Sequence, residues 1–432
     1  MNWKWSDRCE HRVVVTGMGV LTRTGETLAE YLASLQAGRS GITQWKCVDT
    51  RIPLRVGGDM SDFHLGEHLA RVGGNYPQEL VERAQRLLGP APLSGRLTAA
   101  AAMQAFTDAG LAQSRVASER VAHVLAGSNL NQQYIQESVL ACREEPEYVD
   151  PLFGLLFLDT DVLSVISEIL GVRGPSFTVG GASASGNLAL LSAIDQLRAG
   201  RAEAALVSGG ACIPDSTVLQ GWVMLDALAT RSFNAEPWRA SRPFDSRREG
   251  FVPSEGAAAV VLETYESARA RSARIYAEVL GAASTSDVSR SSIPNADGQA
   301  WAMQAALADA SLDPEEINYV NAHATSSRLG DAVEVNAIKT VFGEHAYDVP
   351  VNATKSMTGH CLSAAGIVEF VATILQMEHG FVHPTINLEE PDPELDLDFV
   401  PKEARDYRIE YALSNSFGFG GLNASVVIGR AS

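Results

Sequence analysis

Residues 174–186 read Gly174-Pro175-Ser176-Phe177-Thr178-Val179-Gly180-Gly181-Ala182-Ser183-Ala184-Ser185-Gly186. The run 176–179 favours a β-strand, and the small residues after it favour a tight turn. Residues 187–199 carry leucine or isoleucine at positions 188, 191 and 194, which predicts a helix that stops at Gly200. The turn therefore places Ser183 at a helix N-terminus, where backbone N–H groups and the helix dipole stabilise negative charge.

Short β-rich runs alternate with amphipathic helical runs along the rest of the chain, which predicts an α/β protein. Further strands are expected at residues 12–20, 204–207, 275–281, 317–322, 411–414 and 424–428. Asp331 and Glu334 have capping-box spacing and are expected to open a helix that ends at Gly343, and another helix is expected at 363–380. The glycine- and proline-rich segment 49–93 is expected to be an irregular surface excursion.

Length and composition limit the class of protein. A chain of 432 residues exceeds one ordinary core, which favours two domains or a duplicated architecture. No apolar run approaches the roughly 18 residues that span a bilayer, and the charged stretch 1–10 has no apolar core of a secretory signal. Five scattered cysteines, without paired spacing, disfavour a metal site or a disulfide framework and fit a reducing cytoplasm. The net charge of −18 argues against a nucleic-acid partner.

Four other stretches share a pattern of glycine, histidine and small polar residues. Two carry histidines: Asn321-Ala322-His323-Ala324-Thr325-Ser326-Ser327, and Thr354-Lys355-Ser356-Met357-Thr358-Gly359-His360 with Glu369 beyond it. The other two are Arg242-Pro243-Phe244-Asp245 and Asn415-Ser416-Phe417-Gly418-Phe419-Gly420-Gly421. Together with the turn at Ser183, and in this order, they resemble the β-ketoacyl synthases, the condensing enzymes of fatty-acid and polyketide assembly. The resemblance runs from about Arg12 to Val427.

This resemblance implies an α/β chain of thiolase-type fold, with two related halves in a five-layer α-β-α-β-α arrangement. Residues 1–265 would form the N-terminal half with Ser183, and residues 266–432 would form the half with His323, Lys355 and His360. The resemblance also implies a homodimer. No cofactor of its own and no metal are expected, because the substrate is carried on the phosphopantetheine arm of an acyl carrier protein.

Residue roles follow from the same resemblance. His323 and His360 would donate hydrogen bonds to the thioester oxygen of a malonyl group, and Lys355, paired with Glu369, would orient them. The backbone N–H groups of Ser183 and Phe419 would form an oxyanion hole. Thr325 and Ser327 would contact the phosphopantetheine arm.

The chain departs from the family pattern at four positions near this site. Ser183 replaces the nucleophilic cysteine, and Gly181 replaces the threonine usual two positions earlier. Ala324 replaces a glycine after the histidine, and Leu422 replaces a threonine after the final glycine pair. The departures indicate a reshaped acyl site and an altered reaction cycle.

The serine weakens one half-reaction of condensation more than the other. A turn of this kind at a helix N-terminus can convert a cysteine thiol of pKa about 8.5 into a thiolate, whereas a serine hydroxyl needs an adjacent general base. Decarboxylation needs only donors that stabilise the enolate left when carbon dioxide departs. The sequence therefore predicts a malonyl-acyl carrier protein decarboxylase. It is similar to the serine-containing synthases of polyketide β-branching cassettes, which supply acetyl carrier protein to an HMG-CoA-synthase-like enzyme.

Two alternatives stay open. The first is a serine-dependent acyltransferase or condensing enzyme in which His360 activates Ser183. The second is a non-catalytic chain-length partner of an active ketosynthase, although such a subunit has no need of His323, Lys355 and His360. Whichever activity the protein has, its overall charge of −18 opposes an acidic carrier protein, so any carrier is expected to dock on a local basic patch.

Overall fold

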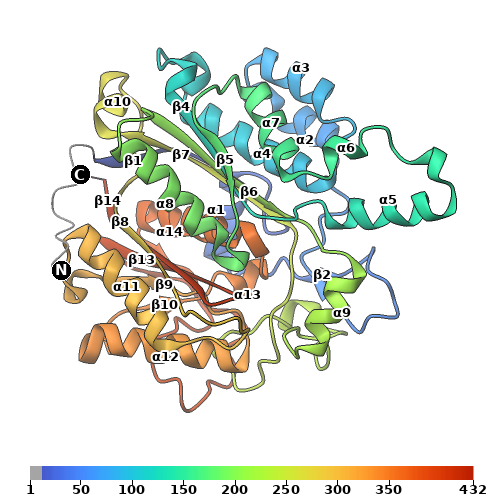
Figure 1. The fold of residues 1–432 in the computed structure, drawn as a ribbon. Coiled ribbons are helices and arrows are strands. Elements are labelled where there is room, and N and C mark those ends of the chain that lie inside the picture. The colour runs from blue at the N-terminus through green and yellow to red at the C-terminus, as the bar shows by residue number, and fades with distance from the viewer. Residues whose placement is uncertain (1–11, 432) are drawn as a thin grey trace.

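The computed structural model describes residues 12–431 and centres on a ten-stranded sheet (Figure 1). The charged N-terminal stretch 1–10 and Cys9 lie outside the described residues. The sheet consists of two five-stranded halves joined where β1 and β8 pair over three residues each, Val13 to Val15 with Ala277 to Val279. No helix of the described part combines the length and apolar character needed to cross a bilayer.

The two halves of the sheet have the same strand order. In sheet order the first half is β5 (Ser176–Val179), β4 (Val121–Ala126), β6 (Ala204–Ala211), β7 (Gly256–Thr264) and β1 (Val13–Thr22). The second is β10 (Val351–Asn352), β9 (Tyr319–Asn321), β13 (Tyr411–Gly418), β14 (Leu422–Arg430) and β8 (Ala277–Ser286). If the five strands of each half are numbered by their order along the chain, their order across the sheet is third, second, fourth, fifth and first in both halves. In each half two parallel pairings are followed by two antiparallel ones.

Helices form three layers around the two halves. The middle layer is α8 (Ser185–Arg198) and α14 (Ala365–His379), each of which contacts strands of both halves (Figure 1). One outer layer is α4 (Leu93–Asp108), which packs on the first half. The other contains α11 (Ala296–Ala310) on the second half, with α12 (Arg328–Phe342) packed beside α11. The five-layer α-β-α-β-α arrangement expected from the resemblance is confirmed.

The duplication extends to the starts of the two middle helices. Each helix follows a short 3-10 turn whose first residue has a positive φ, 48° at Ala182 and 45° at Leu362. Each also has glycine at its second position, and a Cβ on Gly186 would lie only 2.9 Å from the Cα of Gly366. The helix N-termini therefore meet at the centre of the molecule. We propose that the halves divide near residues 265 and 266, because the strand order starts again at β8.

Most elements form where the sequence pattern predicts them. Strand β5 and the end of α14 at Gly380 agree with prediction, and β1, β6, β8, β9, β13 and β14 differ only in their ends. Helix α12 begins earlier than predicted: Ser327 is its N-cap and accepts from the Gly330 N–H, so Asp331 and Glu334 lie buried inside the helix. Capping-box spacing alone misplaced this boundary.

The prediction of an irregular segment at 49–93 is wrong in part, because two amphipathic helices form there. These are α2 (Leu65–Val72) and α3 (Gln78–Leu87). Leu69 on the first, and Leu80 and Ala84 on the second, are buried in the same hydrophobic cluster as α4. Apolar residues four apart, such as 80 and 84, were the signal that glycine and proline content obscured.

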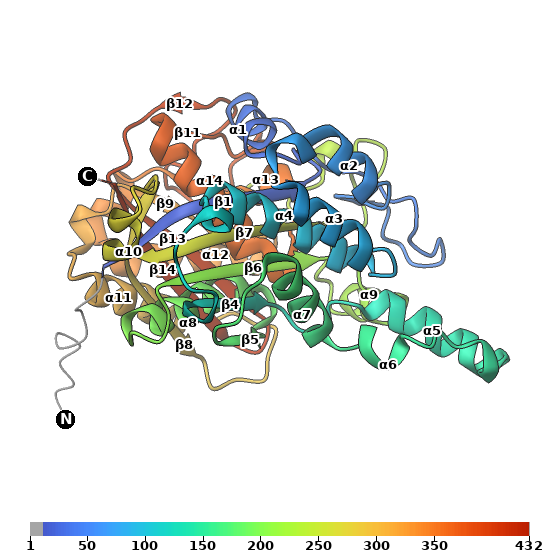
Figure 2. The ribbon, with the colours of Figure 1, turned by 90° about the horizontal axis from the view of Figure 1, so that it is seen from above.

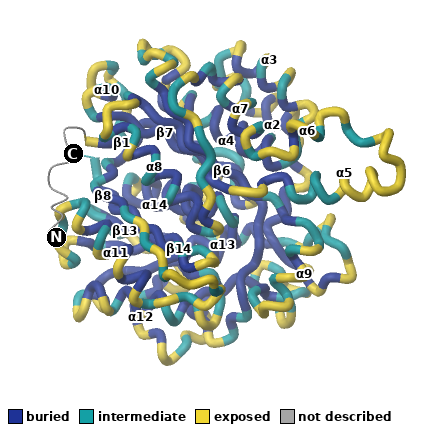
Figure 3. Tube along the Cα trace, viewed as in Figure 1, coloured by how far each residue is buried: buried dark blue, intermediate teal, exposed yellow. Residues whose placement is uncertain are grey.

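Seven further helices complete the described part of the chain. They are α1 (Leu28–Ala37), α5 (Gln132–Glu144), α6 (Phe153–Leu156), α7 (Asp159–Leu170), α9 (Ser216–Met224), α10 (Tyr265–Ala270) and α13 (Lys355–Thr358). Short strands β2 (Thr43–Gln44) and β3 (Val56–Gly57) pair with each other, as do β11 (Phe381–Val382) and β12 (Arg405–Asp406). Helix α5 projects from the body (Figure 2), and Figure 3 shows its far end exposed, whereas most strands of the sheet are buried.

Candidate active site

The turn between β5 and α8 holds Ser183 in a shape that its neighbours require. A Cβ on Gly181 would lie 2.2 Å from Cδ1 of Leu188, so a side chain at 181 would displace that leucine. The Gly181 N–H donates to the Ser185 hydroxyl at 2.8 Å, which closes the turn. Ser183 is consequently presented at the start of α8, as the sequence predicts.

His360 reaches this turn from the other half of the molecule. Its Nε2 lies 2.8 Å from the Ser183 hydroxyl oxygen. Its backbone is fixed by Val252 and Ser254: the His360 N–H donates to the Val252 carbonyl at 2.8 Å, and the Ser254 N–H donates to the His360 carbonyl at 3.0 Å. The Phe251 ring meets the imidazole edge-on, with 5.3 Å between ring centroids. Nδ1 of His360 is buried and has no hydrogen-bond partner among the described residues.

His323 follows β9 and is held through its backbone by a buried carboxylate. Glu334, on α12, accepts the N–H groups of His323 at 2.8 Å and of Ala324 at 2.7 Å. Asn415 donates to the same carboxylate at 3.2 Å. Ala324 has a φ of 28°, a region that disfavours a side chain, where the family pattern has glycine. The sequence pattern indicated a capping role for Glu334, so its contact with the His323 backbone was missed. The available signal was an acidic residue on the same face of α12 as its buried apolar residues.

Lys355 connects His323 to Glu369 in the interior. Its ammonium donates to the His323 carbonyl at 2.6 Å and to Glu369 Oε1 at 2.5 Å, and it lies 3.3 Å from Nδ1 of His323. The Lys355 and Glu369 side chains are each only 1% exposed. An ammonium has donors only, so Nδ1 of a neutral His323 accepts and its proton sits on Nε2.

Both histidines are held neutral. Burial, and then the positive charge of Lys355, lower the pKa of His360 well below its usual value. The same two causes lower the pKa of His323, with a smaller contribution from His360. The two rings stand nearly perpendicular, with centroids 5.6 Å apart. A pair of neutral imidazoles is a weak base and a good source of N–H donors for a developing negative charge.

The other residues expected in the site line the same cavity of about 550 Å³. The Thr325 hydroxyl donates to the Ser327 hydroxyl at 3.1 Å, while Ser327 also caps α12. A Cβ on Gly418 would lie 2.4 Å from the Gly181 carbonyl oxygen, so the turn that carries Phe419 packs against the turn between β5 and α8. The structure therefore brings Ser183, His323, His360, Thr325, Ser327 and Phe419 to one cavity, with Lys355 and Glu369 behind it.

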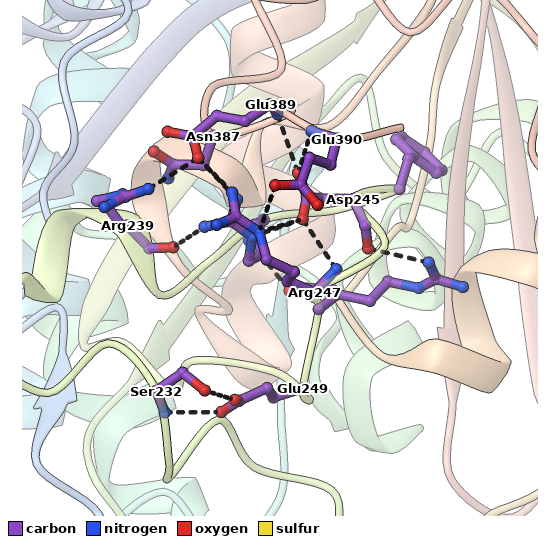
Figure 4. A network of polar contacts seen from close by, with 12 residues as sticks. Ser232, Arg239, Asp245, Arg247, Glu249, Asn387, Glu389 and Glu390 are labelled. Carbon is purple, nitrogen blue, oxygen red and sulfur yellow. Dashed lines mark hydrogen bonds and ion pairs between the residues drawn. The ribbon is translucent and has the colours of Figure 1, made fainter. Parts of the chain in front are cut away.

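The Arg242-Pro243-Phe244-Asp245 motif belongs to a polar network beside the site (Figure 4). Burial raises the pKa of the Asp245 carboxyl, but the Arg242 guanidinium at 2.9 Å and backbone N–H groups outweigh it and hold the pKa at about 2. Glu389 accepts from Arg239, Arg242 and Arg247 together. The network joins the loop near 245 to the segment near 389.

This network also holds the loop that follows His323. The Arg248 guanidinium donates to the carbonyls of Ser327 and Arg328, at 3.2 Å and 2.8 Å. The Gly250 N–H donates to the Ser326 carbonyl at 3.0 Å. The motif is therefore structural support for the loop and has no group at the cavity. Among residues 12–431, no cluster of three or more His, Cys, Asp or Glu side chains could hold a metal ion.

Comparisons with known proteins agree with this geometry. Residues 10–268 match the beta-ketoacyl synthase N-terminal domain, and residues 276–389 match the C-terminal domain. The chain is 35% identical, over 96% of both proteins, to the polyketide biosynthesis malonyl-ACP decarboxylase PksF of Bacillus subtilis. It is 36% identical to a 3-oxoacyl-[acyl-carrier-protein] synthase 2 of Vibrio harveyi, over 97% of this chain and 98% of that protein.

A solved structure extends the comparison to the fold. A type II polyketide ketosynthase, solved in complex with its acyl carrier protein and bound to a hexaketide, superposes with a TM-score of 0.86. The identity is 29%, over 98% of this chain and 100% of that one. All three relatives are named for, or bound to, an acyl carrier protein, which supports the expectation of a carrier-borne substrate. The chain belongs to the β-ketoacyl synthase family and has its thiolase-type fold.

Proposed function

We propose that this protein decarboxylates malonyl-acyl carrier protein to acetyl-acyl carrier protein without forming an acyl-enzyme. The observation that carries the proposal is the placement of the two histidines: both are buried and line the cavity that holds Ser183, where burial and the charge of Lys355 lower the pKa of each. The similarity to a malonyl-ACP decarboxylase supports it. The condensing synthases are equally similar, so the proposal rests on the chemistry of the site.

In the proposed reaction the bond between the malonyl carboxylate and the α-carbon breaks. Carbon dioxide leaves, and the bonding electron pair passes into the thioester as an enolate. The N–H of His323, fixed on Nε2 by Lys355, and the Nε2–H of His360, shared between the Ser183 hydroxyl oxygen and the substrate, stabilise the enolate oxygen. A proton from water then converts the α-carbon to the methyl group of an acetyl thioester.

The Ser183 hydroxyl serves in this proposal to position His360. It is the hydrogen-bond partner of His360 Nε2, and the other ring nitrogen has none among the described residues. The hydroxyl therefore fixes the rotation of a ring that otherwise packs against the rings of Phe251 and His323. The backbone N–H groups of Ser183 and Phe419 remain the proposed oxyanion donors, and Thr325 and Ser327 remain the proposed contacts of the phosphopantetheine arm.

A serine-dependent acyltransferase is the second candidate, because Ser183 and His360 are 2.8 Å apart. In that mechanism His360 would take the hydroxyl proton and become a cation. Among residues 12–431 its Nδ1 has no carboxylate as a hydrogen-bond partner, the ring is buried, and Lys355 lowers its pKa further. In serine hydrolases an aspartate at this nitrogen stabilises the cation. The surroundings of His360 therefore favour decarboxylation.

Substitutions of Ser183 separate the two candidates. Ser183→Ala is expected to lower kcat for decarboxylation by about tenfold or less, since one positioning hydrogen bond contributes roughly 0.5–1.5 kcal/mol. Ser183→Cys restores a thiol and is expected to acquire an acyl group from acyl carrier protein, as seen in the intact mass of the enzyme. The parent is expected to stay unmodified. A stable acyl group on the parent's Ser183, together with a complete loss of activity in Ser183→Ala, would establish the acyltransferase instead.

The place of this activity in the cell is also proposed. The acetyl carrier product would feed an HMG-CoA-synthase-like enzyme in a β-branching step of polyketide biosynthesis, as the resemblance of the sequence implies. A cytoplasmic location fits the free thiols of Cys47, Cys142, Cys212 and Cys361.

We also propose a homodimer. Among the described residues, strand β5 ends the large sheet and pairs on one side only, and Leu140, Leu155 and Phe157 in or next to α5 and α6 are exposed. Open strand edges and clustered exposed apolar residues mark association surfaces. Sedimentation is expected to give twice the chain mass of 46.1 kDa, and a monomer at micromolar concentration would contradict the proposal.

A further inference from the structure

Four large apolar side chains stand exposed around the mouth of the active-site cavity. Leu225, Ile293, Leu329 and Phe419 all line the cavity, yet they are 57%, 65%, 51% and 42% exposed. We call these four residues the collar. None of them belongs to a hydrophobic core cluster of the described residues. A group of exposed apolar residues at the entrance to a site indicates a surface that another molecule covers.

The collar is assembled from four separate parts of the chain. Leu225 ends α9, and Ile293 lies in the loop between β8 and α11. Leu329 is in the first turn of α12, and Phe419 is in the turn between β13 and β14. Because four separate segments place exposed apolar side chains at the same opening, the exposure does not result from the conformation of a single loop.

The charges at this opening do not form a basic patch. The basic side chains that line the cavity are Arg231 and Arg328, apart from the neutral histidines, and the acidic ones near the mouth are Asp226, Glu249 and Asp287. Arg231 is already paired with Asp226. Fewer cations than anions line the mouth, and the chain as a whole carries −18. The local basic patch expected from the sequence is therefore not found among the residues of the cavity mouth.

We propose that the collar is the docking surface for the acyl carrier protein, and that this contact is apolar instead of electrostatic. The inference rests on the proposed function and names its partner surface. The cavity that the collar surrounds leads to Ser183, His323 and His360, so a carrier must sit over the collar while its arm delivers the thioester. With an excess of acidic groups at the mouth, apolar contact supplies the attraction that charge does not.

The test compares a carrier-borne substrate with a small one. The double variant Leu225→Gln/Leu329→Gln removes apolar contact from two sides of the collar while retaining side chains that suit a helix. We expect KM for malonyl-carrier to rise by roughly tenfold or more, from the loss of buried apolar area. KM for malonyl-pantetheine, which lacks the carrier protein, is expected to change less than about twofold, because only the protein contact is lost. Trp301→Gln, which removes an exposed apolar ring from α11, is the matched control and should leave both KM values unchanged.

Salt distinguishes apolar from electrostatic docking. KM of the parent for malonyl-carrier is expected to vary less than about threefold between roughly 0.05 M and 0.5 M NaCl, because apolar contacts are not screened. A steep rise of KM with salt would overturn the apolar docking. An equal rise of KM for both substrates in the double variant would also overturn it, since the collar would then contact the arm. A lower sedimentation mass of the variant would assign the collar to a second copy of the chain.

Failure of the docking surface and failure of the proposed function give different results. Binding of the phosphopantetheine-bearing carrier is measured by calorimetry, which requires no turnover. If neither malonyl substrate is decarboxylated while the double variant binds the carrier about tenfold more weakly than the parent, docking at the collar is supported and the proposed decarboxylation is wrong. If turnover is normal while carrier binding is the same in parent and variant, the collar fails and the function stands.

Discussion

His323→Ala is expected to lower kcat for malonyl-carrier decarboxylation by about 10²–10³-fold, the loss typical of removing one donor to an oxyanion. The enolate oxygen would lose the Nε2–H that Lys355 fixes through Nδ1. KM should change little, because the donor acts on charge that develops only in the transition state. Steady-state measurement of carbon dioxide release checks the size of the loss.

His323→Gln is the matched control for the role of this ring. A glutamine amide can place an N–H donor near the position of Nε2, but it cannot accept and carry a proton as a base does. We expect it to retain at least about one tenth of the parent kcat, far above His323→Ala. Equal inactivity of the glutamine and alanine variants would mean that His323 transfers protons, which contradicts a donor role.

Lys355→Met is expected to destabilise the fold by about 3–5 kcal/mol, because it leaves the Glu369 carboxylate buried and without its cation. The pair lies inside the protein, so screening by solvent does not reduce the effect. Lys355→Met/Glu369→Leu removes both charges and is expected to recover most of the stability. Urea denaturation of the parent, the single variant and the double variant measures this, and a single variant as stable as the parent would exclude the expected role of the pair.

The same lysine gives a pH signature. Burial, and then the charge of Lys355, lower the pKa of His323, so the parent histidine stays neutral as the pH falls through 6.5. Removing the cation raises the pKa of His323 toward its usual value. The activity of the double variant should therefore fall at a higher pH than that of the parent, as His323 becomes protonated. A pH profile identical to that of the parent would show that Lys355 does not control the protonation of His323.

The sequence was informative where a local pattern determines the structure. The run 176–179 and the glycines after it predicted the strand and turn that present Ser183, and the two histidine motifs predicted which residues meet there. Other features depend on contacts between distant residues. Glu334 resembles a capping residue along the chain, and only the packing of α12 against His323 reveals what it binds.

The equivalence of the two halves has a similar explanation. Ala182 and Leu362 share a backbone conformation, and Gly186 and Gly366 share a packing role, but the side chains around them differ. A repeat of backbone shape with different side chains leaves little pattern in the sequence. The collar was also hidden, because Leu225, Ile293 and Leu329 resemble core residues until their exposure is known.

The most direct measurement of the proposed decarboxylation is the mass spectrum of malonyl-carrier after incubation with the protein in heavy water. The expected product is acetyl-carrier with one solvent-derived deuterium in its methyl group, since the enolate takes its last proton from water, and the enzyme itself stays unmodified. Malonyl-carrier that persists unchanged, or an acyl group transferred to Ser183, would contradict decarboxylation by neutral histidines.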